Sequence, residues 1–94
     1  MSKRDEYIEK LKVKLDEWNA DLNKLEAKTE HAKEDLKEIY HEEIDALRQQ
    51  CDNIKGRLKE LAGSSEGAWE ELKVGADEAW KKLGEAIDRA RSKF

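Results

Sequence analysis

The chain has 94 residues, a length that accommodates one domain. Charged residues make up 45% of it, aromatic residues only 6%, and proline is absent, a mixture typical of long or coiled-coil helices rather than of a globule with a large apolar core. The net charge is -4 and the signs alternate along the chain, so no basic face predicts nucleic-acid binding. The regular spacing of the apolar residues argues against disorder.

The sequence contains no run of about 18 apolar residues, so we expect no membrane-spanning helix. Its first residues, MSKRDEYIEK, contain no hydrophobic signal segment, which predicts that the protein is not exported. Cys51 is the single cysteine and cannot form a disulfide within the chain. These features together predict a protein of the reducing cytoplasm.

The first part of the chain, up to about residue 62, has apolar residues at alternating steps of three and four, the spacing of a coiled-coil seam. The pattern slips by one residue after Ile39 and continues through Tyr40 and Ile44. This slip cancels the drift of about 20° per heptad that a straight helix shows against a seven-residue repeat. We therefore predict one nearly straight helix over about 3–62, roughly 90 Å long.

The segment LAGSSEG is expected to end this helix. Gly63 suits the left-handed position after a helix end, and Ser64 or Ser65 can cap the next helix. The prediction is a loop over 63–67 and a second helix over about 67–93, roughly 40 Å long. The fold class is all-α, a single domain over 1–94 in which the shorter helix folds back as an αα-hairpin.

The second helix carries an eleven-residue repeat, AWEELKVGADE followed by AWKKLGEAIDR, in which Trp69 returns as Trp80. Eleven residues in three turns keep an apolar stripe almost parallel to the helix axis. We interpret the stripe as a docking face, and Gly56 as a place on the first helix where an indole can lie close. Lipid-surface binding is the alternative, although the acidic balance disfavours attraction to anionic lipid. The predicted hairpin docking face comprises Tyr40, Ile44, Leu47, Cys51, Ile54, Leu58, Trp69, Leu72, Ala76, Trp80, Leu83, Ile87 and Phe94.

The shorter helix can cover the long one only back to about Leu36, which leaves an apolar seam without a partner in the chain. Such a surface seldom stays exposed, so we expect a homodimer or higher oligomer. Two long helices pairing antiparallel about a centre near Ala32 satisfy this need, and a parallel pair or a trimer also fits. Small Thr29 and Ala32 permit a close crossing or mark a weak point in the seam. The predicted self-association seam comprises Ile8, Leu11, Leu15, Trp18, Leu22, Leu25, Ala32 and Leu36.

Catalytic and metal sites are not predicted. Glu38 and His41 match the Glu-x-x-His spacing of di-iron bundles, but such a site needs four carboxylates and two histidines facing the core, and this pair lies at the edge of the seam. Cys51 falls on the seam and is interpreted as a small core residue, with a redox-sensing thiol as the alternative. The sequence has no Ser-His-Asp set, glycine-rich phosphate loop or CxxC motif, so we expect no enzyme and no cofactor.

Two segments resemble a group of short bacterial coiled-coil proteins labelled as stress-response or uncharacterised. They are MSKRDEYIEKLKVKLDEWNADLNKLEAK, with its Asp16-Glu17-Trp18, and GSSEGAWEELKVGADEAWKKLGEAIDRARSKF, which ends on Phe94. The resemblance implies a helical, oligomeric protein raised under stress and supplies no catalytic residues. The expected function is that of a non-enzymatic, oligomeric interaction or scaffold protein, with membrane-surface binding through the second helix as the alternative.

Overall fold

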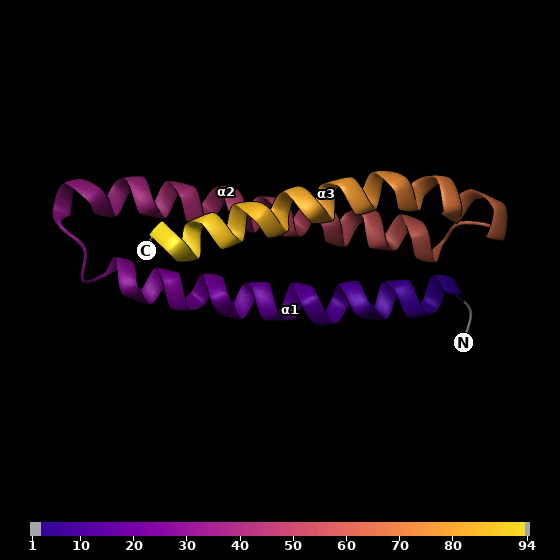
Figure 1. Cartoon of the computed structure of the whole chain (residues 1–94), viewed down its shortest axis with the longest axis horizontal. Helices are drawn as coiled ribbons and strands as arrows, with labels where there is room; N and C mark the ends of the chain where they lie inside the picture. Colours follow the sequence, from indigo (N-terminus) through magenta and orange to yellow (C-terminus); the bar gives the residue numbers. More distant parts are fainter. Residues whose placement is uncertain (1–2, 94) are drawn as a thin grey trace.

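A computed structural model describes residues 3–93 and forms three α-helices, with no strand within that range. The helices are α1 (Lys3–Thr29), α2 (Glu34–Ala62) and α3 (Glu66–Lys93). They run up, down and up beside one another in an elongated bundle whose Cα extents are 51 × 19 × 18 Å (Figure 1). The predicted all-α class is confirmed by this architecture.

The prediction of one helix over 3–62 is wrong. The chain leaves the helix after Thr29 and re-enters it at Glu34, and we call the intervening residues 30–33 the hinge. The hinge contains neither glycine nor proline, so local preference does not require a break. The break is explained by packing, because folding back lets α1 bury its apolar seam within its own chain, and tertiary burial outweighs helix propensity.

The core runs the full length of the bundle. All three helices contribute large apolar side chains with at most about a tenth of their surface exposed, so the seam of each helix faces the other two. Cys51 lies fully buried among them, and burial raises the pKa of its thiol. The core consists of Ile8, Leu11, Leu15, Trp18, Leu22, Leu25, Ile44, Leu47, Cys51, Ile54, Leu58, Leu61, Trp69, Ala76, Leu83, Ile87 and Ala90.

The second turn connects α2 to α3. Gly63 ends α2 with φ -90° and ψ -2°, a right-handed conformation, so the predicted left-handed glycine is wrong. The hydroxyl of Ser64 donates a 2.6 Å hydrogen bond to the carbonyl of Leu61 instead. The Ser65 hydroxyl accepts from the backbone N–H of Ala68 at 3.4 Å, consistent with the predicted serine cap, and α3 begins at Glu66.

The indole of Trp18 meets a glycine, but not the one expected. A methyl group at Gly56 would have no atom within 4 Å, so the predicted close approach at Gly56 is wrong. A methyl group at Gly84 of α3 would come within 3.3 Å of the Trp18 ring. The glycine that lets an indole approach therefore lies on the shorter helix.

Candidate interaction surface at the hinge end

The predicted self-association seam lies mostly inside the chain. Its first six residues, from Ile8 to Leu25, are buried against α2 and α3. The last two, Ala32 and Leu36, are only half-buried and lie in the hinge and in the first turn of α2. The expectation that α1 lacks a partner in its own chain is thus wrong. The part of the seam that stays uncovered lies only at the hinge end.

Most of the predicted hairpin docking face lies in the same core. Tyr40 and Trp80 are half-buried, Leu72 is 37% exposed, and Phe94 lies outside the described residues. The remaining members are buried: Ile44, Leu47, Cys51, Ile54, Leu58, Trp69, Ala76, Leu83 and Ile87. The apolar stripe of α3 is therefore occupied by protein in this structure.

The hinge is a tight turn held mainly by its own backbone. The N–H groups of His31 and Ala32 donate to carbonyls three residues back, at 3.1 and 3.0 Å. Thr29 is buried, and its hydroxyl donates to the carbonyl of Leu25 at 2.9 Å. Lys33 occupies the N-cap of α2 in an extended conformation and makes no side-chain cap hydrogen bond. Since lysine is a poor N-cap, α2 begins without the side-chain acceptor that usually stabilises a first turn.

The first two turns of α2 project beyond the last turn of α1 and beyond the end of α3 (Figure 1). We call residues 34–40 the overhang. Ile39 is 50% exposed there, and Leu36 and Tyr40 are half-buried. A hollow of about 190 Å³, lined by Thr29, Ala32, Tyr40 and other residues, separates the hinge from the overhang. The packing between α1, α2 and α3 is therefore incomplete at the hinge end.

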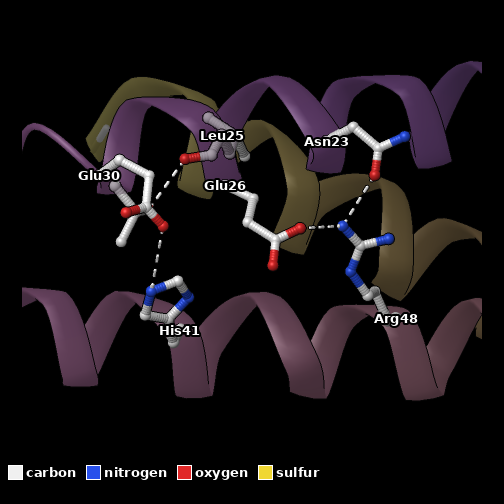
Figure 2. Close-up of polar contacts among 7 residues, drawn as sticks. Asn23, Leu25, Glu26, Glu30, His41 and Arg48 are labelled. Atoms are coloured by element: carbon white, nitrogen blue, oxygen red, sulfur yellow. Dashed lines mark hydrogen bonds and ion pairs between the residues drawn. The ribbon is translucent and has the colours of Figure 1, made fainter.

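A polar ladder joins one edge of α1 to α2 (Figure 2). The guanidinium of Arg48 donates to the side-chain oxygen of Asn23 at 2.8 Å and to the carboxylate of Glu26 at 2.7 Å. Seven positions further along the chain from Asn23, Glu30 of the hinge lies 4.0 Å from His41, which is seven positions before Arg48 on α2. The two rungs, Asn23–Arg48 and Glu30–His41, are both symmetric about the midpoint between residues 35 and 36, which fixes the antiparallel register of the two helices.

Metal ligands are not gathered at this end of the bundle. Within residues 3–93, no group of three or more His, Cys, Asp or Glu side chains is placed to hold an ion. Glu38 is exposed, and His41 faces Glu30 across the ladder. The Glu-x-x-His match therefore belongs to the surface and the polar edge of the bundle.

Comparisons with family models, curated proteins and solved structures found no match to the chain. The functional argument thus rests on the residues themselves. Across the part of the chain that the structure describes, no helix is long and apolar enough to cross a membrane.

The hinge is the feature that the sequence pattern missed. Its signal in the sequence is the small residues Thr29 and Ala32, which predict either a crossing point or a weak point. The structure supports the second interpretation, because the chain turns there. Because lysine is not a typical N-cap residue, Lys33 does not predict that a helix starts after it.

Proposed function

We propose that this protein is a non-enzymatic helical interaction protein of the cytoplasm that assembles with itself through the hinge end of the bundle. The observation that carries the proposal is the overhang, where Ile39 is 50% exposed beside half-buried Leu36 and Tyr40. Apolar side chains that cluster on an otherwise charged surface favour a protein partner. The resemblance of both end segments to stress-response proteins makes stress the expected setting for this activity.

The main alternative, binding to a membrane surface through α3, requires the bundle to open. Trp69, Leu83 and Ile87 lie in the core, and among the large apolar side chains of Glu66–Lys93 only Leu72 and Val74 leave a large part of their surface exposed. An α3 that stays docked therefore offers lipid little apolar area. Self-association at the hinge end leaves the apolar face of α3 in the core.

The solution mass tests the proposal. We expect light scattering of the purified chain to show a dimer or larger species that dissociates on dilution. Ile39→Glu should weaken the assembly at least tenfold, because it places a charge in the apolar contact. Val74→Glu is the matched control, since Val74 is 62% exposed on a helix away from the overhang and should leave the mass unchanged.

A monomeric mass at every concentration up to the millimolar range would refute self-association. Co-sedimentation with phosphatidylcholine or phosphatidylserine vesicles, together with that monomeric mass, would favour the lipid alternative.

A further inference from the structure

We propose that the self-association is a domain swap: the hinge becomes helical, α1 and α2 merge into one long helix, and α1 packs on α2 and α3 of a second copy. The inference rests on the proposed self-association and adds the way in which the two copies combine. Each copy would give its α1 to the other, so every core contact of the closed bundle is kept but joins two chains. Exchange of an identical element is a low-cost route to a dimer.

The hinge is able to become helical. Its four residues, Glu-His-Ala-Lys, include no glycine or proline, and no residue of the described chain has a positive φ. In a continuous helix the N–H groups of Lys33, Glu34 and Asp35 would each find a carbonyl four residues back. In the closed bundle the N-cap residue of α2 is Lys33, which makes no side-chain hydrogen bond to the backbone N–H groups of the first turn. The swap therefore completes the backbone hydrogen bonding of a helix start that the turn leaves without a side-chain cap.

The apolar seam continues in phase through the hinge. With about 100° between successive residues, Ala32, Leu36 and Ile39 of a continuous helix lie within about 40° of the direction of Leu25. They would form one face with the buried seam of α1. In the closed bundle the same three side chains are half-buried or half-exposed. A continuous helix would align this uncovered surface so that a second helix can cover it.

The polar ladder identifies that second helix as another copy of this chain. The observed rungs, Asn23–Arg48 and Glu30–His41, are separated by seven positions in the chain on each side, although Glu30 lies in the hinge (Figure 2). The next rung in the same register is Lys37 against Glu34, a pair of opposite charges. Within one chain both residues lie on α2, so this rung can form across an antiparallel pair only when two copies meet. The twofold axis then passes between Asp35 and Leu36.

Mass action and charge set the balance between the two states. The swapped dimer keeps the core contacts and adds the covered overhang, whereas the closed monomer avoids the loss of translational freedom on association. The axis also brings Asp35 of one copy close to Asp35 of the other, where like charges oppose the dimer. Asp35→Asn is accordingly expected to shift the equilibrium toward the dimer at least threefold.

Cross-linking across the ladder distinguishes a swap from any other dimer. The variant Glu30→Cys/His41→Cys in a Cys51→Ala background places two thiols on one rung for a short bismaleimide. In the dimer fraction, a swap gives a covalent dimer on a denaturing gel. A covalent monomer from that same fraction would overturn the swap while leaving self-association intact. A chain that is monomeric throughout would remove both.

Hinge and ladder variants provide an independent measurement. Lys33 has φ -64°, the value that proline prefers, but proline within the long helix would break it, so Lys33→Pro should abolish the dimer. If that variant fails to fold, Lys37→Glu is used instead. At the new rung it places a glutamate of one copy against Glu34 of the other, and this repulsion should weaken the dimer about threefold. Glu34→Lys/Lys37→Glu should restore it. Equal dimer fractions in all these folded variants would contradict the swap.

Small-angle X-ray scattering supplies the shape. The closed bundle spans 51 Å between its extreme Cα atoms, whereas a continuous helix over 3–62 spans roughly 90 Å. The swap requires a dimer with a maximum dimension near that of the long helix, and the cross-link distinguishes it from an unswapped end-to-end pair of similar length. A compact dimer about as long as the closed bundle would contradict it.

Discussion

The indole of Trp18 on α1 lies against that of Trp80 on α3, with ring centroids 4.4 Å apart and planes inclined at 36°. Gly84, one turn further along α3, leaves room for the outer edge of the Trp18 ring. Trp18 is 4% exposed, whereas Trp80 is half-buried and covers it from outside. The first and last helices, which are not sequential in the chain, are thus joined at mid-length by an aromatic pair.

Truncation of the two tryptophans should have unequal effects. Trp18→Ala is expected to lower the free energy of unfolding by about 3–5 kcal/mol, because it leaves a cavity at a fully packed site. Trp80→Ala should cost about half as much, since solvent already reaches its ring. Urea unfolding followed by circular dichroism measures both, and equal losses would contradict the observed difference in burial.

Two glycine substitutions should act in opposite directions. Gly56→Ala should stabilise the protein by up to about 1 kcal/mol, because alanine is the better helix former and its methyl group meets no neighbour. Gly84→Ala gains the same propensity but presses on the buried Trp18 ring, and overpacking of this kind costs about 1–3 kcal/mol. We therefore expect Gly84→Ala to be destabilising. Thermal unfolding of both variants checks this, and a stabilised Gly84→Ala protein would show that Trp18 yields easily.

The bundle should lose stability at alkaline pH through Tyr7. Burial, together with the 2.5 Å hydrogen bond that its hydroxyl donates to Asp77, raises the pKa of Tyr7 well above the ordinary 10.0. A group whose pKa is raised on folding contributes stability that is complete below its unfolded pKa and declines as the pH rises above it. Unfolding measured from pH 8 to 11.5 should therefore show a decline above pH 10.

Tyr7→Phe is the matched variant for this titration. It should be less stable than the natural protein at pH 8 by about 1–3 kcal/mol, the usual effect of losing a hydrogen bond to a charged group. Its alkaline decline should also be smaller. An identical decline in both proteins would assign the effect to other groups.

A cap supplied at the hinge should stabilise the closed bundle. Lys33→Asn places a side-chain acceptor at the N-cap of α2 and is expected to add about 0.5–1 kcal/mol to the free energy of unfolding. Lys33→Gln removes the same charge without offering a good cap and serves as the control. If both variants change stability equally, the effect comes from the charge rather than from the cap.

The apolar spacing predicted much of the structure because it reports which face of a helix is buried. It predicted that Leu15 and Leu22 are covered by a second copy and that Ile54 is covered by the shorter helix, and all three are buried within the chain. It could not locate the break after Thr29, because a seam of this period continues through the hinge whether the chain runs straight or folds back. The choice between the two depends on packing between distant segments, which residues 30–33 do not encode.

The candidate interaction surface was harder to predict for the same reason. The sequence predicts Ile39 within a continuous helix, whereas its 50% exposure depends on where α1 and α3 end relative to the first turns of α2. The ladder of Glu30 with His41 was also missed, since a pairing register appears only when two helices are brought together.

The alkylation rate of the Cys51 thiol reports how often the bundle opens. This thiol is fully enclosed in the closed bundle and would be equally enclosed in the swapped dimer, since both states have the same core. Passage between them requires α1 to detach, and this detachment exposes the sulfur to an alkylating reagent. The rate of Cys51 labelling under native conditions should therefore set an upper limit on how fast one state converts into the other. Mixtures of the two should persist for as long as the thiol stays unlabelled.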